Sequence, residues 1–293
     1  MHKAGFVNIV GNPNVGKSTL MNRLVGERIS IATFKAQTTR HRIMGIVNTD
    51  EMQIVFSDTP GVLKPNYKLQ ESMLAFSESA LTDADVLLYV TDVVENPEKN
   101  MEFLEKVQKM TIPVLLLINK IDESDQKTLG DIVTKWHSLL PNAEILPISA
   151  KNKFGTDILL KRIKELLPDS PPYFDKEQLT DKPARFFVSE IIREKILLYY
   201  DKEIPYAVEV KVDRFKEDDR HIHINAVIFV ERESQKGIII GHQGYALKKV
   251  STESRKALEK FFGKSIYLEV FVKVDKDWRS SQKELDSFGY NDV

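Results

Sequence analysis

Short apolar runs alternate with segments of helical period through the first half of the chain. The runs are rich in Val, Ile and Leu, as strands buried on both faces of a sheet are, and they cover residues 6–10, 54–57, 86–90, 114–118 and 145–148. Residues 101–108 and 158–167 carry apolar side chains at helical spacing. This alternation predicts an α/β fold with a mostly parallel sheet covered by helices on both faces. Residues 43–47 favour an extra strand, antiparallel to 54–57 across the turn-like sequence NTDEM.

The alternation breaks at LLPDSPPYFDKEQLTDKPARF, where the density of proline excludes a helix or a central strand. We therefore predict a first domain over 1–170, a linker over 171–183, a smaller α/β domain over 184–275 and a tail over 276–293. The second domain is expected to contain helices at 186–200, 234–240 and 245–262, and strands at 206–213, 221–230 and 266–274. We expect the tail to pack back as a short helix, and we assign it no site.

Composition narrows the class of protein. The chain has 293 residues, a formal net charge of −1 and no cysteine, which excludes disulfides, cysteine-ligated zinc and thiol catalysis. A chain-wide attraction to nucleic acid or to an anionic membrane is absent, so any such site must be local. The N-terminal apolar run is too short for a signal peptide, and no stretch approaches the roughly 20 apolar residues that a membrane-spanning helix needs. We interpret the protein as cytoplasmic.

The sequence GNPNVGKS, residues 11–18, matches the phosphate-loop pattern G-x-x-x-x-G-K-[ST], and it follows a predicted strand and opens a predicted helix at 19–25. Its glycines let successive backbone N–H groups point at phosphate, and the helix N-terminus adds partial positive charge. Lys17 is expected to reach the β- and γ-phosphates, and the Ser18 hydroxyl to bind Mg²⁺. The predicted loop residues are Gly11, Asn12, Pro13, Asn14, Val15, Gly16, Lys17, Ser18 and Thr19.

A second motif, Asp58-Thr59-Pro60-Gly61, ends the predicted strand 54–57 at the carboxyl edge of the sheet, where ligands bind in such folds. The Asp58 carboxylate can hold Mg²⁺ through water, and the Gly61 N–H can approach a γ-phosphate. Without the phosphate loop, an aspartate before Thr-Pro-Gly would more often be a turn residue. We also assign the next residue, Val62, to the nucleotide site.

A third motif, Asn119-Lys120-Ile121-Asp122, follows the strand 114–118. An aspartate there can accept hydrogen bonds from both N1–H and the 2-amino group of guanine. Adenine offers neither donor, so the motif favours GTP over ATP. Ser149, Ala150 and Lys151 follow the last strand, and their backbone amides can face the guanine O6.

The second domain carries a different signal. Gly241-His242-Gln243-Gly244 lies between two predicted helices and resembles the G-x-x-G loop of a type II KH domain, which clamps about four single-stranded nucleotides. Residues 236–264 contain a local excess of Lys and Arg. In the second helix we expect Leu247, Val250, Ser254, Ala257 and Phe261 to form the core face. The residues predicted to bind RNA are Lys236, Gly241, His242, Gln243, Gly244, Lys248, Lys249 and Arg255.

The order GNPNVGKS, QTTRH, DTPG, NKID and SAK resembles the translation-factor-related class of GTPases. The whole chain, with one such domain followed by a KH-like part, is similar to the Era family of bacterial ribosome-assembly GTPases. One departure concerns the KH loop: the family commonly has lysine and glycine at the two middle positions, which here are His242 and Gln243. The loop is therefore expected to depend more on backbone N–H groups and on Lys248 and Lys249.

The resemblance also implies a switch and a catalytic cation. One of the threonines in QTTRH binds Mg²⁺ in the similar family, and an ungapped alignment favours Thr39, with Thr38 contributing backbone. Val62 stands where many GTPases carry a water-orienting glutamine. GTPases that lack this glutamine often use an asparagine at the position of Asn14 to hold K⁺ against the phosphates, with carbonyls near Thr33 and Lys35 completing its shell. The alternative is that Asn14 only serves a left-handed turn.

We therefore predict a slow, Mg²⁺-dependent GTPase that K⁺ assists and that switches between GTP and GDP. The resemblance implies that its RNA is the 3′ end of small-subunit ribosomal RNA in a pre-30S particle, that the protein is a monomer, and that it can contact the cytoplasmic face of the inner membrane peripherally. Two alternatives remain open. One is a nucleotide-dependent RNA chaperone with negligible hydrolysis of its own, which Val62 permits. The other is a related assembly GTPase whose KH-like domain contacts only protein, although such chains typically carry two GTPase domains and lack G-x-x-G.

Overall fold

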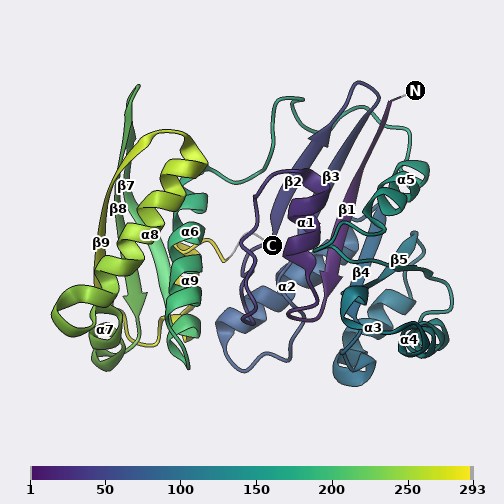
Figure 1. Cartoon of the computed structure of the whole chain (residues 1–293), viewed down its shortest axis with the longest axis horizontal. Coiled ribbons are helices and arrows are strands. Elements are labelled where there is room, and N and C mark those ends of the chain that lie inside the picture. The colour runs from purple at the N-terminus through teal and green to yellow at the C-terminus, as the bar shows by residue number, and fades with distance from the viewer. Residues whose placement is uncertain (1, 291–293) are drawn as a thin grey trace. The chain divides into compact units, whose positions relative to one another are not determined.

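The structure is a computed structural model, and it describes residues 2–290. Its described residues divide into two compact units (Figure 1). The first comprises residues 2–66 and 70–181, and the second comprises 67–69 and 182–290. Residues 291–293 of the predicted tail, and residue 1, lie outside the described residues.

A six-stranded sheet with the order β2-β3-β1-β4-β5-β6 forms the centre of the first unit. All neighbours pair in parallel except β2, which runs antiparallel to β3 and forms an edge. The fold class predicted from the apolar runs is therefore confirmed, including the antiparallel edge strand. The strands are β1 (Lys3–Gly11), β2 (Ile43–Asn48), β3 (Met52–Asp58), β4 (Val86–Asp92), β5 (Val114–Asn119) and β6 (Glu144–Pro147).

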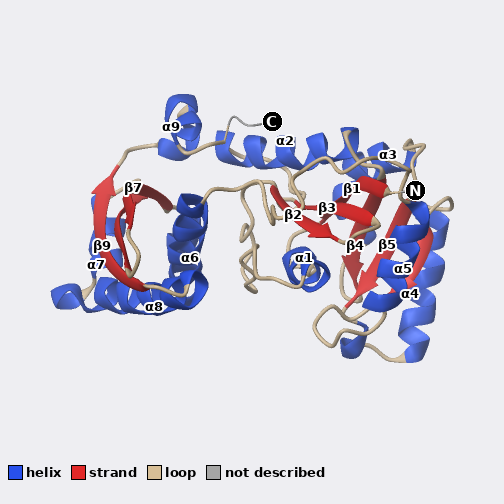
Figure 2. Ribbon diagram, turned by 90° about the horizontal axis from the view of Figure 1, so that it is seen from above, coloured by secondary structure: helices blue, strands red, loops and turns tan. Residues whose placement is uncertain are grey.

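Helices cover both faces of this sheet, as Figure 2 shows for α1 and α2. They are α1 (Lys17–Val25), α2 (Lys68–Thr82), α3 (Met101–Gln108), α4 (Gln126–Leu139) and α5 (Thr156–Leu166). Phe103 of α3 and Trp136 of α4 share one buried apolar cluster with Leu87 and Leu116 of the sheet. Because β1, β3, β4 and β5 are parallel, their carboxyl ends meet at one edge, where the loops after them form the candidate nucleotide site.

Residues 171–181 of the predicted linker, 171–183, belong to the first unit and lie along its sheet. The backbone N–H groups of Tyr173 and Phe174 donate to the buried side-chain oxygen of Gln53, at 2.7 and 3.0 Å. Further along, the Ile46 N–H donates to the Leu179 carbonyl at 2.8 Å. These bonds hold the segment against β2 and β3 up to the point where the second unit begins.

The second unit is built on a three-stranded sheet, β7-β8-β9, in which β7 and β8 are antiparallel and β8 and β9 are parallel. Its elements are α6 (Ala184–Tyr199), β7 (Glu209–Glu217), β8 (His221–Val230), α7 (Glu233–Ile240), α8 (Tyr245–Phe262), β9 (Ser265–Val274) and α9 (Gln282–Ser287). The predicted order of elements is confirmed. The first strand begins later than the predicted 206–213, because residues 204–206 form a short 3-10 turn around Pro205, whose fixed φ suits a turn.

One prediction about the core of the second unit is wrong. Phe261 is 41% exposed and stacks on the Phe187 ring at 5.3 Å, whereas Leu258 is fully buried. The buried stripe of α8 follows the four-residue spacing of Val250, Ser254 and Leu258, which turns Phe261 out of the core.

The tail packs into the second unit, and its short helix is the one that the sequence predicts. Trp278 is fully buried, and its indole N–H donates to the Ala207 carbonyl at 3.2 Å. The Tyr290 hydroxyl donates to the buried Glu209 carboxylate at 2.7 Å. Residues 278–290 therefore contribute core packing to this unit.

Candidate functional site

The loop between β1 and α1 brings the predicted phosphate-binding residues together. Lys17 is nearly buried, and its Nζ donates to the carbonyls of Gly11 and Asn12 at 3.0 and 2.8 Å. Burial lowers the pKa of Lys17 to about 8, and the charges of Asp58 and Glu95 partly offset this effect. Thr19 lies in the first turn of α1, one residue beyond Ser18. A lysine ammonium beside the N-terminus of a helix is well placed to bind phosphate.

Three side chains from separate segments converge beside Lys17. The Ser18 Oγ lies 2.8 Å from the Thr39 Oγ1 and donates to the Asp58 Oδ2 at 2.7 Å, while the Thr39 hydroxyl lies 3.3 Å from the same carboxylate oxygen. Two hydroxyls and a carboxylate are oxygen ligands that suit Mg²⁺, either directly or through water. These residues are the ones that the sequence predicts for the metal.

The Asp58 carboxyl is fully buried, and burial raises its pKa, against which the charge of Lys17 and hydrogen bonds from Ser18 and Thr39 act in the opposite direction. Its Oδ1 has no hydrogen-bond partner among the residues that the structure describes. A buried carboxylate oxygen of this kind fits a site that a cation completes.

The two switch threonines point to different partners. The Thr38 hydroxyl lies 2.7 Å from the Thr33 hydroxyl and donates to the Lys35 carbonyl at 2.6 Å, so it stabilises its own loop. The Thr39 side chain contacts Ser18 and Asp58. The backbone role expected of Thr38 stays a prediction.

The motif after β3 packs directly on the phosphate loop. A Cβ added to Gly61 would lie 2.7 Å from the Cα of Pro13, so no larger residue fits there without movement. The Val62 N–H donates to the Gly11 carbonyl at 3.1 Å, and its side chain is buried in an apolar cluster. Two more hydrogen bonds fix this segment, from the Thr59 hydroxyl to the Ile9 carbonyl and from the Ser77 hydroxyl to the Pro60 carbonyl.

Asn14 lies exposed at the tip of the phosphate loop. Its φ is 67°, in the left-handed region that asparagine tolerates, so the local-turn interpretation fits its backbone. Its carbonyl accepts a hydrogen bond from Lys120 Nζ at 2.7 Å, and Lys120 also pairs with Asp92 at 2.6 Å. Lys120 thus ties the loop after β5 to the phosphate loop.

The predicted guanine-binding residues also lie together. The Asn119 side chain donates to the Val15 carbonyl at 2.8 Å and accepts from the Ala150 N–H at 3.0 Å, which links the phosphate loop to the loop after β6. The Ser149 hydroxyl donates to the Asp122 carboxylate and thereby orients it. Lys151 is exposed beside them.

Two residues that the sequence analysis missed lie against this site. The Asn100 amide donates to the Val62 carbonyl at 3.0 Å and to the side-chain oxygen of Asn12. Glu95 accepts from the Thr91 hydroxyl at 2.6 Å, and burial raises its pKa. Both follow β4, whose carboxyl end reaches the same edge of the sheet as β1 and β3. Their position after this strand was the feature of the sequence that could have predicted them.

In the second unit, the loop between α7 and α8 has the backbone that its glycines permit. Gly241 and Gly244 have φ of 71° and 78°, and a Cβ on Gly241 would lie 2.6 Å from that of Ala246. His242 and Gln243 are exposed between them. The Tyr200 hydroxyl donates to the Ile239 carbonyl at 2.6 Å and anchors the end of α7 beside the loop.

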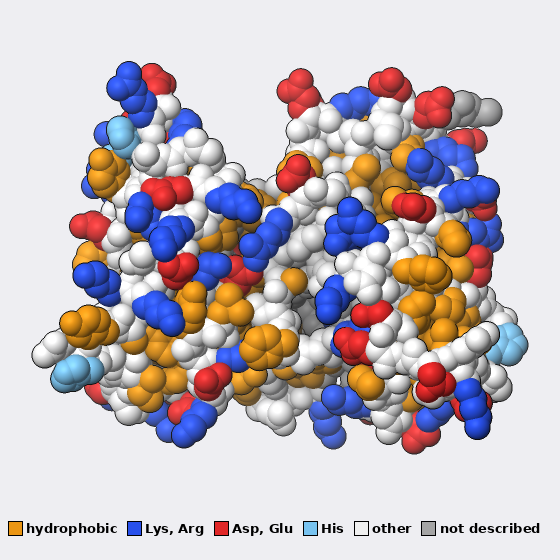
Figure 3. All heavy atoms as spheres, viewed as in Figure 1, with side chains coloured by type: hydrophobic (Ala, Val, Ile, Leu, Met, Phe, Trp, Pro, Cys, Tyr) orange, Lys and Arg blue, Asp and Glu red, His pale blue; other side chains and the backbone are white. Residues whose placement is uncertain are grey.

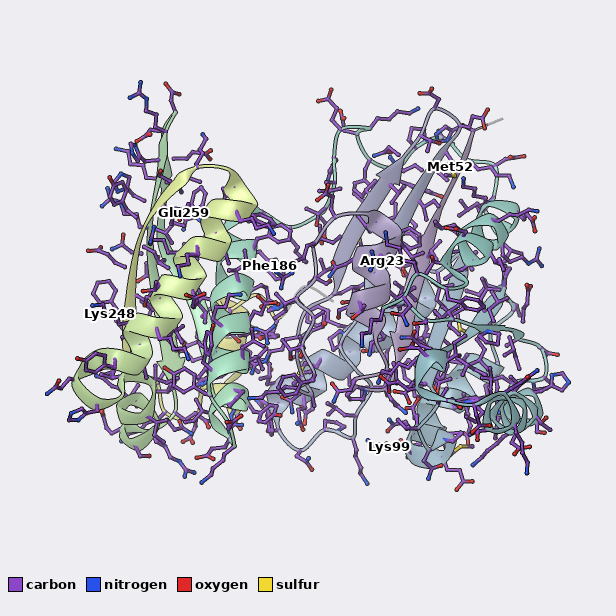
Figure 4. The ribbon with its side chains drawn as sticks, viewed as in Figure 1. Arg23, Met52, Lys99, Phe186, Lys248 and Glu259 are labelled. Carbon is purple, nitrogen blue, oxygen red and sulfur yellow. The ribbon has the colours of Figure 1, made fainter. Side chains whose placement is uncertain are left out.

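The basic residues around this loop differ in whether other side chains of the protein contact their charged groups. Lys248 and Lys236 have no ion pair within residues 2–290, whereas Lys249 lies over the Tyr199 ring at 4.3 Å and Arg255 pairs with Glu259 at 2.7 Å. Figure 3 shows Lys and Arg side chains over α8, and Figure 4 shows Lys248 near the loop end of this helix and Glu259 near the other end. Lys236 and Lys248, which precede and follow the loop in the sequence, are therefore the basic side chains of this group that carry charge without an ion-pair partner in the described part of the chain.

Within the described residues, no helix is both long enough and apolar enough to cross a membrane.

Comparison with known proteins matches both units. Residues 6–120 match the family model described as 50S ribosome-binding GTPase, and residues 203–279 match the KH domain. The GTPase Era of Staphylococcus epidermidis is 42% identical over 99% of this chain and 97% of its own length, and that of Clostridium kluyveri is 42% identical over 99% and 100%.

Two solved structures are also similar to the whole chain. One is Era in complex with MgGDPNP and nucleotides 1506–1542 of 16S ribosomal RNA, with a TM-score of 0.94, 38% identity and 99% coverage of both chains. The other is a variant of Aquifex aeolicus Era bound to GDP and AlF4−, with the same TM-score and identity, covering 98% of this chain and 99% of that one. Because it is similar to these proteins over nearly its whole length, the chain belongs to the Era family of GTPases.

Proposed function

We propose that this protein is a GTP-hydrolysing switch that binds single-stranded RNA at the 3′ end of the small-subunit ribosomal RNA and assists assembly of the small ribosomal subunit. It acts in the cytoplasm as a monomer on the pre-30S particle. The observation that supports this most is that the residues of the nucleotide motifs lie together in the first unit and that the second unit has a G-x-x-G loop, in a chain similar throughout to an Era protein bound to MgGDPNP and 16S ribosomal RNA.

Each residue of the nucleotide site then has a role. Lys17 binds the β- and γ-phosphates, and the Gly61 N–H donates to the γ-phosphate. Ser18 and Thr39 would hold Mg²⁺, with the Asp58 carboxylate acting through water, and the ion would neutralise charge on the phosphates. Because the Thr39 hydroxyl lies against Ser18 and Asp58, the segment around Thr39 is ordered by the metal and released after hydrolysis.

Hydrolysis is slow because Val62 offers no hydrogen-bonding group to orient the attacking water. Asn14 compensates in part, since its amide oxygen helps to hold K⁺ where other GTPases place an arginine finger. The exposure of Asn14 at the tip of the phosphate loop leaves its amide accessible for this role. Carbonyls in the loop around Thr33 and Lys35 supply further ligands.

Asp122 is expected to determine nucleotide choice. Asp122→Asn replaces an acceptor-only carboxylate by an amide, which can no longer accept from both guanine N1–H and the 2-amino group. GTP affinity should fall about 10- to 150-fold, the range for one charge-assisted hydrogen bond. Affinity for xanthosine triphosphate should rise, because its 2-oxo group accepts from the new amide. Competition binding with a fluorescent nucleotide measures both; unchanged preference for GTP would refute the assignment.

Replacing Na⁺ by K⁺ at constant ionic strength should accelerate single-turnover GTP hydrolysis. The matched variant is Asn14→Gly, which keeps the left-handed backbone but removes the amide. We expect this variant to bind GTP normally and to hydrolyse it at the same rate in both salts. If K⁺ stimulates the glycine variant as strongly as the unmodified protein, Asn14 has only a conformational role.

Crosslinking to RNA tests the proposed function as a whole. A Gly241→Asp/Gly244→Asp double variant places two carboxylates where the loop backbone would approach phosphate, so crosslinks to the 3′ end of 16S ribosomal RNA should disappear while GTP binding persists. A Ser280→Asp/Ser287→Asp double variant, which adds the same two charges at exposed positions outside the loop, should keep the crosslinks. Crosslinks that survive the double change would show that the loop is not the RNA site.

A further inference from the structure

The sheet of the second unit has one face that α6 and α8 cover and an opposite face that the tail covers at one end, where the Phe288 ring packs on Phe229 of β8 at 5.2 Å. Figures 1 and 2 show α6 and α8 on one side of this sheet. Ile222, Ile224, Ala226, Ile228 and Val230 of β8 are buried in the core on that side. Because strand side chains alternate, the odd-numbered residues of β8 and β9 point to the opposite side. We call this side the outer face; its exposed part consists of Lys211, Arg214, Lys216, His221, His223, Asn225, Tyr267, Glu269, Phe271 and Lys273.

Aromatic rings form the centre of the outer face. Tyr267 is 56% exposed, and its ring stacks on that of His223 at 4.7 Å with an interplanar angle of 11°. The His221 ring lies 5.4 Å from the same tyrosine ring and is tilted by 41° to it. Phe271, four residues further along β9, is 50% exposed on the same face. Exposed apolar side chains that gather on one face, rather than being scattered singly, are typical of binding surfaces.

The charges around these rings are mostly positive. The strand register sets Lys216 opposite His223, Arg214 opposite Asn225, and Lys211 opposite Val227. Lys273 adds a fourth basic side chain. The exposed Glu269 carboxylate on this face accepts a hydrogen bond from Asn225 at 2.6 Å, and the Asp218 carboxylate just beyond β7 lies 3.7 Å from the His221 Nδ1. Flat aromatic rings flanked by Lys and Arg are the arrangement that binds single-stranded nucleic acid, because every base has a face that can stack.

We propose that the outer face is a second contact for single-stranded RNA, with one base stacked on Tyr267 and a second on Phe271. Lys216 and Arg214 bind the phosphates between and beside these bases. Tyr267 and Phe271 are about 13 Å apart along the strand, so one extended RNA segment following β9 can reach both. The outer face lies across the sheet from α8, so it is distinct from the G-x-x-G loop. This inference rests on the proposed RNA binding of the second unit.

Binding to oligouridylates of two lengths tests the proposal on the full chain. The short one, of about four nucleotides, fills the loop site alone; the long one can also occupy the outer face. Tyr267→Ala should weaken binding of the long oligomer about 5- to 150-fold, the loss that one stacked base represents, and should leave the short one unchanged. Tyr267→Phe keeps the ring and should bind both normally. Phe271→Ala provides an independent variant on the same face.

Photocrosslinking gives a readout that a purely structural role would not produce. With 4-thiouridine in the long oligomer, we expect crosslinked peptides that contain Tyr267 or Phe271, and we expect them to persist in the Gly241→Asp/Gly244→Asp variant. The proposal is overturned if Tyr267→Ala and Phe271→Ala bind the long oligomer like the unmodified protein, as they would if this face contacts a protein instead. If the unmodified protein binds neither oligomer, the proposed RNA binding of the chain fails as well.

Discussion

The Asp58 carboxylate lies buried at the end of β3, beside an equally enclosed Lys17 ammonium and two hydroxyls that come from separate segments. Burial shifts the pKa values of both groups toward their neutral forms, so each depends on the other and on what binds between them. Triphosphate and Mg²⁺ supply the missing charges. Without a ligand, the charges of these buried groups are therefore not fully balanced by the protein, and we propose that this makes the adjoining loops respond to the nucleotide.

The segment around Thr39 and the segment after Asp58 both lie in direct contact with the Asp58 carboxylate or the phosphate loop. Thr39 reaches Asp58 through its hydroxyl, and the segment after Asp58 lies on the phosphate loop through Gly61 and the Val62 N–H. Asn100 adds a third connection, because its amide bridges Asn12 and the Val62 carbonyl. If a γ-phosphate binds the Gly61 N–H as we propose, these bonds would have to rearrange, and a small change in the ligand would then reorganise a longer stretch of chain.

Much of this architecture could be predicted from sequence because its signals are local. Strands buried on both faces must be continuously apolar, and the nucleotide motifs are fixed by the chemistry of phosphate and guanine. Asn100 and Glu95 were missed because the loop that carries them has no motif, and only the order of strands in the sheet brings it to the phosphate loop. Phe261 was misassigned because helical spacing alone does not decide between two adjacent stripes of α8. The stack of His223 on Tyr267 likewise depends on the register of β8 with β9, which sequence alternation does not determine.

We propose that the nucleotide, acting through Asp58 and Thr39, controls RNA binding. To test this, the affinity for the 3′ segment of 16S ribosomal RNA is measured with a non-hydrolysable GTP analogue and Mg²⁺, and again with GDP, for the unmodified protein and for Thr39→Ala. We expect the two nucleotides to give different affinities in the unmodified protein and the same affinity in the variant. If the difference between nucleotides is unchanged in Thr39→Ala, or is absent from both proteins, the nucleotide does not control RNA binding in this way.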